Sequence, residues 1–368
     1  MKYIFWQNML SLHMAPFINS LSEISDVTLV VTKEIERRRL EEGWTVPKYL
    51  ENTTIKIDPS KSEIVDILSI AGAIHVFFGI NAYPMVYFAF RAAIRMNIKI
   101  FIMQEPIQWI GIRGALRVIL WLWFRVKYST KIWGYFNTGT TNSRFINKLC
   151  YDKKKLYDWA YFTNIDNSII LNKLSDSVRS LPNLIFIGSI DENKNILNLV
   201  NLLLKYLDIF NRLIIIGTGP LEEELLSIVA GIPKMEFMGR VDNDKIMDII
   251  QDSDLLMLPS KWDGWGYVVN EALVSGTPAL VSDKSGAACL LDRKIRGDVI
   301  SDNINRLNRP ILNWIARGPV PPGHRAKIKT WSINAISGQV GAKYFISVID
   351  HCLEGNSKKP EVPWLKDD

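Results

Sequence analysis

The sequence predicts an α/β protein built from two doubly wound, Rossmann-like domains that face a cleft. Its 368 residues are enough for two ordinary domains, each with its own apolar core. Short apolar runs alternate with helical patterns along the whole chain, which is typical of parallel sheets covered on both faces. In such folds ligands bind at the carboxyl ends of the strands, so we expect a site there in each half.

The first series of runs predicts the sheet of an N-terminal domain at residues 1–165. Residues 62–70 and 84–96, between these runs, have helical spacing. The strand-like runs are Tyr3–Trp6, Val27–Val31, Ile74–Phe78, Ile98–Met103 and Ile132–Phe136.

The second series predicts a C-terminal domain at residues 183–335, after a polar linker at residues 166–182. Segment 336–368 holds a last helix, whose pattern extends over Ala335–Cys352, and a tail. The strand-like runs of the second domain are Leu184–Ile187, Leu213–Ile216, Leu255–Leu258 and Ala279–Val281.

Composition excludes several classes of protein. Apolar residues make up 48% and charged residues 22% of the chain, which indicates a globular protein.

The charge is unevenly distributed along the chain. Residues 1–165 hold 21 Lys and Arg against 13 Asp and Glu, a net charge of +8, whereas the remainder has a net charge of −2. We therefore expect an acidic partner for the first half. No nucleic-acid-binding motif accompanies this charge, so nucleic acid is not expected. Three scattered cysteines, four isolated histidines and no cleavable signal pattern predict a cytoplasmic protein without a metal site.

Residues 259–278 predict an anion-binding loop. A strand ends at Leu258, a glycine-punctuated loop follows, and a helix begins near Gly266. Free N–H groups and the helix dipole favour a phosphate at such a helix start. Asp263 and Glu271 bracket the loop, with Glu271 about 7 Å along the helix at about 1.5 Å per residue. The pattern suits a sugar–diphosphate–ribose ligand. When only the loop is considered, an ordinary turn of a doubly wound domain, with no ligand, is an equally good interpretation.

The whole stretch resembles the signature of retaining glycosyltransferases of family 4 (glycosyltransferase group 1), which have the GT-B fold. Their motif is Pro-Ser, a short spacer, Glu-Gly-Phe-Gly, a second Glu eight residues after the first, and a Gly-Thr-Pro turn. The matching residues are Gly264, Gly266, Glu271 and residues 276–278. Asp263 stands where Glu is usual, and Trp265 where Phe is usual. The resemblance implies that Glu271 holds the ribose hydroxyls, and that Asp263 with the loop amides orients the donor sugar.

Further elements resemble the same family in the same order. Phe186–Asn195 resembles an element whose Arg and Lys clamp the donor diphosphate: Lys194 aligns with the lysine, whereas Ser189 replaces the arginine. A hydroxyl supplies neither charge nor a bidentate fork. Ile215–Pro220 resembles a Gly-x-Gly-Pro loop, and Phe237–Val241 an element that faces the base. With Lys261 as a further cation, these elements add to the implied donor site Gly188, Gly217, Gly219, Gly239 and Arg240. The implied donor-binding residues of the later loop and helix are Asp263, Gly264, Trp265, Gly266 and Glu271.

The resemblance also implies that the first domain binds the acceptor, and that the last helix crosses back onto it. Glu105 ends a strand at the place where many family members keep a histidine; it binds a sugar hydroxyl or caps the turn. His13 follows the first strand on the acceptor side, where a solvated loop histidine is the alternative. The candidate catalytic residues are Asp263, Glu105 and Lys194.

Residues 107–128 predict a helix at a membrane surface. The apolar run Val118–Phe124 is too short to span a bilayer, which needs roughly 20 residues. Aromatic and basic residues on one helical segment suit an anionic lipid surface, and the alternative is a core helix with basic ends. The residues named for membrane contact are Trp109, Arg113, Arg117, Trp121, Trp123, Arg125 and Lys127.

We therefore expect a retaining glycosyltransferase that uses a nucleotide-diphosphate sugar and no cofactor. We expect no Asp-x-Asp-type metal pair, so Lys194, with Arg240 or Lys261, and the helix N-terminus would neutralise the diphosphate. The expected acceptor is a glycan, lipid-linked, in bacterial-type surface polysaccharide assembly on the inner face of the membrane. The alternatives are transfer to a soluble acceptor and a non-catalytic donor-binding subunit of a glycan-assembly complex.

Overall fold

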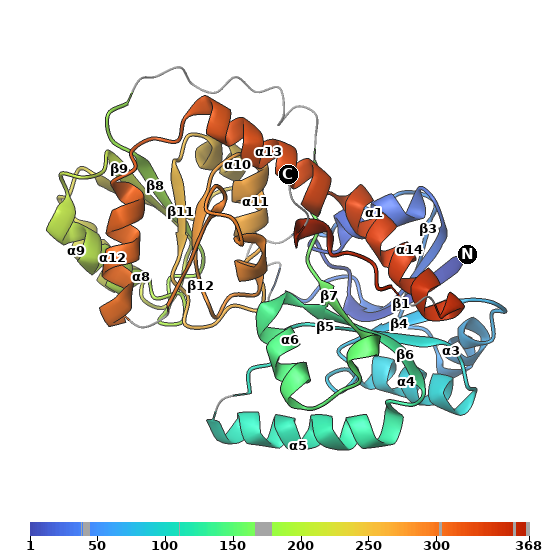
Figure 1. The fold of residues 1–368 in the computed structure, drawn as a ribbon. Helices are drawn as coiled ribbons and strands as arrows, with labels where there is room; N and C mark the ends of the chain where they lie inside the picture. The colour runs from blue at the N-terminus through green and yellow to red at the C-terminus, as the bar shows by residue number, and fades with distance from the viewer. Residues whose placement is uncertain are drawn as a thin grey trace. The chain divides into compact units, whose positions relative to one another are not determined.

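A computed structural model describes the chain except residues 38, 40–44, 110, 166–178, 302–303, 356–357 and 366–368. The chain forms two compact units (Figure 1). Unit 1 contains Met1–Asn164 and Ile336–Pro363, and unit 2 contains Ile165–Ala335 and Trp364–Asp368. Most of the expected linker at 166–182 lies outside the described residues.

Unit 1 has a seven-stranded parallel sheet in the order β3-β2-β1-β4-β5-β6-β7. Chain order reverses between β1 and β4, and such a switch point is where doubly wound folds bind ligands. The strands are β1 (Lys2–Met9), β2 (Asp26–Lys33), β3 (Thr53–Ile57), β4 (Ile74–Phe78), β5 (Ile100–Gln104), β6 (Ile132–Thr138) and β7 (Leu156–Trp159).

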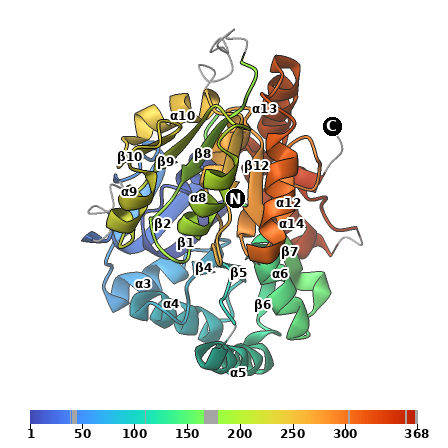
Figure 2. The same cartoon turned by 90° about the vertical axis from the view of Figure 1, so that its left-hand side faces the viewer.

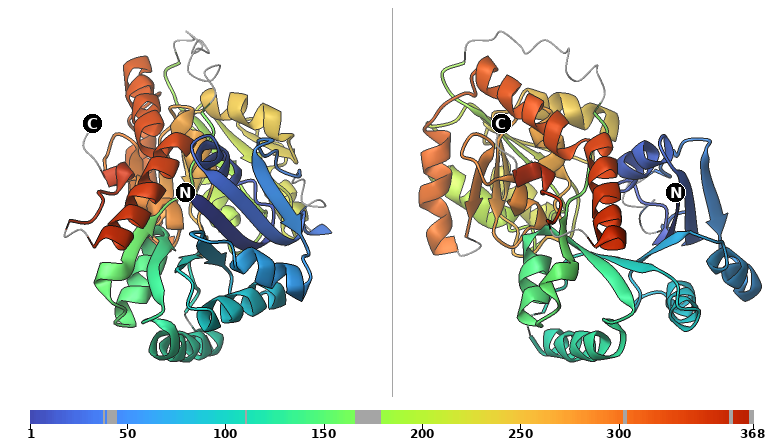
Figure 3. Two further views of the ribbon diagram at one scale, coloured as in Figure 1. Left: turned by 90° about the vertical axis from the view of Figure 1, so that its right-hand side faces the viewer. Right: turned by 45° about the vertical axis from the view of Figure 1, so that its right-hand side comes forward.

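Helices cover both faces of this sheet (Figures 1 and 3). One face packs against α3 (Lys61–Leu68), α4 (Pro84–Arg95), α5 (Gly111–Tyr128) and α6 (Gly139–Lys148). The other face packs against α1 (Ala15–Ser22) and α14 (Gly338–Glu354).

The helix α14 belongs to unit 1 although it follows the helices and strands of unit 2 in the sequence. Ser337 caps its first turn by accepting the Val340 N–H. The ring of Phe345 lies 5.4 Å from that of Phe17 on α1, and the Tyr344 hydroxyl donates to the Asp158 carbonyl oxygen at 3.0 Å. Aromatic burial therefore fixes α14 against the first sheet.

Unit 2 has a six-stranded parallel sheet in the order β10-β9-β8-β11-β12-β13, with its switch point between β8 and β11. Figure 2 shows its strands β10, β9 and β8 side by side. The strands are β8 (Asn183–Ile187), β9 (Arg212–Ile216), β10 (Met235–Gly239), β11 (Leu255–Leu258), β12 (Ala279–Ser282) and β13 (Gly297–Ile300). The helices are α8 (Ile196–Leu203), α9 (Glu222–Val229), α10 (Asn243–Gln251), α11 (Val268–Val274), α12 (Ile304–Ile315) and α13 (Pro322–Ile336). Short 3₁₀ helices lie at Leu204–Tyr206 and Gly286–Leu290 in unit 2, at Lys153–Lys155 in unit 1, and at Pro363–Leu365, where the assignment changes from unit 1 to unit 2.

The predicted fold class is confirmed, because both sheets are parallel and carry helices. Every apolar run named from the sequence forms a strand. The strands without such a run are β3, β7, β10 and β13, which are the edge strands of the two sheets. An edge strand is buried less completely, so its sequence lacks a continuous apolar run.

Candidate functional site

The predicted donor-site residues gather at the carboxyl edge of the unit 2 sheet. They follow four neighbouring strands, β10, β9, β8 and β11. By strand, they are Gly188, Ser189 and Lys194 after β8; Gly217 and Gly219 after β9; Gly239 and Arg240 at the end of β10; and Lys261 and Asp263–Gly266 after β11. The sheet order thus brings together segments that lie up to 78 positions apart in the sequence, from Gly188 to Gly266.

An ion pair joins the two loops at the switch point. The Lys194 ammonium donates to the Asp263 carboxylate, and the two side chains are only 19% and 12% exposed. The Lys261 N–H donates to the Asn193 carbonyl oxygen, and the Asn193 amide donates to the Trp262 carbonyl oxygen, both at 2.7 Å. These bonds hold one cation and one carboxylate side by side where the chain order reverses.

Asp191 is a residue of this loop that the sequence analysis did not identify. Its carboxylate accepts the Ser189 hydroxyl at 2.6 Å and the Lys194 N–H at 2.8 Å. An aspartate that bonds the backbone two or three positions later is a common turn device, and this spacing was the signal that could have revealed it. Position 189 therefore contributes a hydroxyl bound to a carboxylate, and no positive charge.

The glycine-rich loop after β11 depends on local backbone geometry. Gly266 has φ of +86°, and a Cβ there would lie 2.8 Å from the Leu258 side chain and 3.0 Å from the Ser285 hydroxyl. Beneath the loop, the buried Trp265 indole donates to the Asn270 side-chain oxygen at 2.7 Å. The Trp265 ring, which we named as a donor-binding residue, thus packs inside unit 2 and supports the loop.

Glu271 lies in the first turn of α11 and is only partly exposed. Its carboxyl group has no hydrogen-bond or ion-pair partner among the described residues. Burial raises the pKa of Glu271 to about 7. A carboxyl group that is desolvated and unpaired can accept hydrogen bonds from ligand hydroxyls, and such groups concentrate at binding sites.

The raised pKa of Glu271 predicts a pH-dependent stability. The folded protein holds this proton more strongly than the unfolded chain, whose carboxyl titrates near 4.5. Stability from this group is complete below about pH 4.5 and is lost as pH rises through about 7. Between pH 5 and pH 8, the free energy of unfolding of the wild type should fall about 1–3 kcal/mol more than that of Glu271→Gln. Urea denaturation of both proteins at pH 5 and pH 8 measures this difference. An equal fall in the free energy of unfolding for the wild type and Glu271→Gln would contradict the raised pKa of Glu271.

In unit 1, the two predicted acceptor-side residues, Glu105 and His13, both contact Tyr161. The Tyr161 hydroxyl donates to the Glu105 carboxylate, and its ring lies 5.6 Å from that of His13. Burial and Glu105 raise the pKa of Tyr161 well above its ordinary value. Burial, with a contribution from Arg39, lowers the pKa of His13 to about 4, so the imidazole is neutral near pH 7. His13 is thus packed against an aromatic ring, unlike a solvated loop residue.

A cavity of about 540 Å³ lies at the switch point of unit 1. The carboxyl ends of β1, β4 and β5 form one wall, which includes Asn8 and Glu105, and Tyr161, which follows β7, also lines the cavity. The helix α5 forms another wall with Arg117 and Trp121. Its volume is in the range of pockets for small molecules.

The helix α5 has one buried and one exposed apolar side. Trp121, Phe124 and Tyr128 are buried in the core of unit 1, so Trp121 faces inward, not toward a membrane. The exposed apolar side chains are Ile112, Leu116, Ile119, Leu120, Leu122, Trp123 and Val126. Figure 1 shows α5 along the margin of unit 1. In the described part of the chain, no helix combines the length and apolar character needed to cross a bilayer.

The other basic and aromatic residues of this segment are partly or fully exposed. Trp109 lies under the Lys148 ammonium at 4.2 Å from its ring centre, and the Lys127 ammonium lies 4.3 Å from that of Trp123. Arg113 is exposed and Arg125 is half-buried. The segment thus combines the two alternatives from the sequence: it is a core helix that also presents an apolar, basic outer surface.

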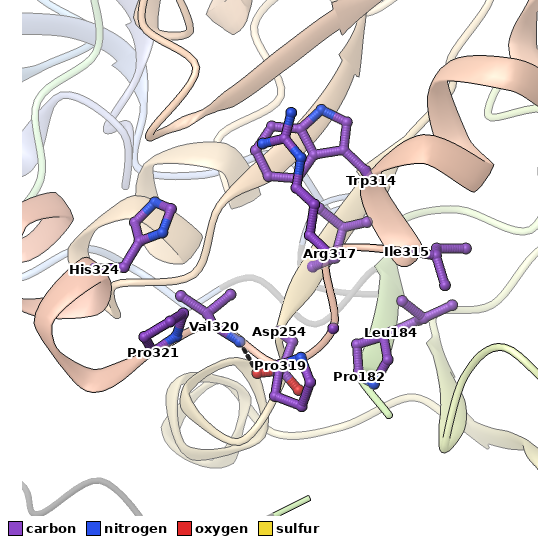
Figure 4. Close-up of a pocket in the computed structure, with 12 residues that line it drawn as sticks. Pro182, Leu184, Asp254, Trp314, Ile315, Arg317, Pro319, Val320, Pro321 and His324 are labelled. Atoms are coloured by element: carbon purple, nitrogen blue, oxygen red, sulfur yellow. Dashed lines mark hydrogen bonds between the residues drawn. The ribbon is translucent and has the colours of Figure 1, made fainter. Parts of the chain in front are cut away.

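The sequence analysis overlooked one Asp-x-Asp pair, Asp252 and Asp254, which lies at the opposite end of the unit 2 sheet from the candidate donor site. Arg325 and Arg179 donate to the buried Asp254, and Arg179 and Arg212 pair with Asp252. Figure 4 shows Asp254 at a cavity of about 50 Å³, where it accepts the N–H of Val320. Arginines pair with both carboxylates at the amino ends of the strands. The cluster therefore links structural elements within unit 2 and lies away from the candidate donor site.

Comparisons with known proteins find similarity to glycosyltransferases, both in the sequence of unit 2 and in the fold of the whole chain. Residues 181–316 match the family described as "Glycosyl transferases group 1". An uncharacterised glycosyltransferase of Methanocaldococcus jannaschii is 29% identical over 118 residues, which are 31% of this chain and 30% of that relative. The chain thus matches less than a third of the length of this curated relative.

Solved structures resemble the chain over almost its full length. The HepE protein of Anabaena, solved in complex with UDP, has a TM-score of 0.69 and 11% identity, with 95% of this chain and 100% of that chain covered. The lipopolysaccharide outer core galactosyltransferase WaaB has a TM-score of 0.68 and 13% identity, with 96% and 99% covered.

The chain therefore has the two-unit α/β fold of GT-B glycosyltransferases. More particularly, residues 181–316, which contain every candidate donor-site residue, match the family model of group 1 glycosyltransferases. Both expectations from the sequence are confirmed at this level, whereas family 4 itself stays a prediction.

Proposed function

We propose that the protein is a glycosyltransferase that moves a sugar from a nucleotide-diphosphate donor to a glycan acceptor, with retention of configuration. The observation that carries this proposal is the Lys194–Asp263 pair at the switch point of the group 1 domain. A cation there suits the diphosphate, and a carboxylate suits the sugar hydroxyls. The UDP bound by the HepE relative supports a nucleotide as the carrier.

Each residue then has a distinct part in the reaction. The bond between the sugar and the diphosphate breaks, and a bond to the acceptor oxygen forms on the same face of the sugar. Lys194, helped by Arg240 or Lys261, stabilises the charge that develops on the leaving diphosphate, so no metal ion is required. Glu271 accepts hydrogen bonds from the ribose, and Asp263 orients the sugar. The acceptor proton passes to the departing phosphate.

Release of free nucleotide from UDP-, GDP- and ADP-sugars tests this proposal. Purified protein should release one nucleotide when incubated with its donor and a suitable acceptor, and slowly with water alone. A protein that binds nucleotide sugars without turnover would instead be a donor-binding subunit of a glycan-assembly complex. A protein that binds none of these donors would contradict the proposal altogether.

We further propose that the acceptor is lipid-linked and that the protein works on the inner face of a membrane, in surface polysaccharide assembly. Support comes from the exposed apolar side of α5 and the basic residues beside it. Aromatic and aliphatic side chains flanked by Arg and Lys bind at the boundary of anionic lipid. The net charge of +8 over residues 1–165 favours the same surface. Transfer to a soluble acceptor is the alternative.

The variant Arg113→Gln/Arg125→Gln/Lys127→Gln should bind anionic vesicles much more weakly than the wild type. Each basic residue near an anionic surface contributes about 1 kcal/mol, so the loss should be about 3 kcal/mol, or roughly a hundredfold. Co-sedimentation with phosphatidylserine-containing vesicles at low salt measures it, and high salt should weaken wild-type binding because exposed charges are screened.

The matched control is Arg95→Gln/Lys153→Gln/Lys154→Gln, which removes the same charge from exposed positions of unit 1 outside α5. It should keep most of the vesicle binding. An equal loss of vesicle binding in both variants would show that binding depends on the net charge of the protein and not on α5. A wild type that ignores anionic vesicles at low salt would favour the soluble acceptor.

A further inference from the structure

We propose that the cavity of unit 1 binds an acceptor in which a phosphate group joins a sugar to a hydrocarbon chain. This inference rests on the proposed function and specifies the chemical class of its acceptor. Three kinds of surface meet at the cavity: polar strand ends, the Arg117 guanidinium, and the apolar side of α5. Each kind matches one part of such a molecule.

The wall at the strand ends suits a sugar. Asn8, Asn81, Gln104 and Glu105 line it, and three of these four groups are neutral amides. Gln104 is only 6% exposed, and its amide donates to the Asn137 side-chain oxygen at 2.8 Å. The Gln104 side-chain oxygen has no partner among the described residues. Amides donate and accept, and a carboxylate accepts, so together they can bind the hydroxyls of a sugar ring.

Arg117 supplies the group for a phosphate. One of its N–H groups donates to the Gln108 carbonyl oxygen at 2.7 Å, which directs the guanidinium toward the loop after β5. Its remaining N–H groups have no partner in the part of the chain that the structure describes. A planar guanidinium with several unused donors binds phosphate oxygens in pairs. The carboxylates that also line the cavity are engaged, Glu36 with Asn8 and Glu105 with Tyr161.

The helix α5 continues from Arg117 into an apolar surface. Leu120 lies one turn after Arg117 and also lines the cavity. Leu116, Ile119 and Trp123 on the same helix are 63%, 64% and 47% exposed. A hydrocarbon chain attached to a phosphate at Arg117 would therefore meet apolar side chains next to the cavity. The sequence analysis assigned Arg117 only to the membrane surface, and the cavity gives it this second contact.

Calorimetry with three probes tests the proposal without any donor. The probes are glucosyl decyl phosphate, decyl glucoside and glucose 1-phosphate, each below its critical micelle concentration. The wild type should bind glucosyl decyl phosphate roughly 10- to 150-fold more tightly than decyl glucoside, since a hydrogen bond to a charged group has about this effect. Arg117→Gln should lose this difference, Arg117→Lys should keep part of it, and Arg95→Gln, an exposed arginine of unit 1, should keep all of it.

The outcomes separate the sources of binding. Equal wild-type affinity for glucosyl decyl phosphate and decyl glucoside, or no binding of either, would overturn the proposal. Glucose 1-phosphate bound as tightly as glucosyl decyl phosphate would show that the cavity recognises phosphate without lipid, which also overturns it. Nucleotide release without an acceptor tests the donor site alone, so a protein that turns over its donor but fails with these probes would reject only this inference.

Discussion

Replacing Lys194 by alanine is expected to lower the rate of sugar transfer about 10²- to 10³-fold, the effect of removing one preorganised group that stabilises transition-state charge. Lys194 lies at the switch point of unit 2, held by Asp263 and by the bond from its backbone to Asp191. Because charge on the diphosphate grows as the sugar departs, the lysine should affect the transition state more than the bound ground state. Turnover should therefore fall much more than the affinity for a nucleoside monophosphate.

Steady-state kinetics and calorimetry on the same preparations measure the two effects. Lys205→Ala, an exposed lysine elsewhere in unit 2, is the matched control and should change neither. Equal losses in turnover and in monophosphate affinity would instead assign Lys194 a structural role through its ion pair with Asp263. Thermal unfolding of each variant shows whether the loops after β8 and β11 still hold together.

Replacing Glu271 by alanine is expected to weaken nucleotide binding roughly 10- to 150-fold, since a hydrogen bond to a charged group contributes about 1.5–3 kcal/mol. The Glu271 carboxyl group is partly buried and has no partner within the described residues, and burial raises its pKa to about 7. Ligand hydroxyls that donate to it would favour its ionised form. Affinity should therefore rise as pH increases through about 7, and Glu271→Gln should lose this rise.

Calorimetric titration with UDP, GDP and ADP at pH 6 and pH 8 provides the measurement. Glu223→Ala, at an exposed position of α9, serves as the control and should bind as the wild type does. A folded Glu271→Ala protein with unchanged nucleotide affinity would remove Glu271 from the site.

Residues close in sequence allowed the strand, loop and helix of the candidate donor site to be predicted. The run Leu255–Leu258 is β11, and the glycine-rich loop and the helix that carries Glu271 follow it, because an apolar run and glycines are local signals. Trp265 was the exception. Its ring is buried in unit 2. Which side chains cover a ring depends on residues distant in the sequence, so a local pattern does not predict this burial.

The sequence by itself determined the alternation of strands and helices, because apolar periodicity records which face of each element is buried. It did not determine the edge strands, and it did not determine which distant side chains meet. Lys194 and Asp263 are 69 positions apart and pair only because β8 and β11 are neighbours in the sheet. Arg117 reaches the cavity of unit 1 only because α5 packs beside the ends of β1, β4 and β5. Such contacts depend on sheet order and helix packing, which the tertiary structure alone decides.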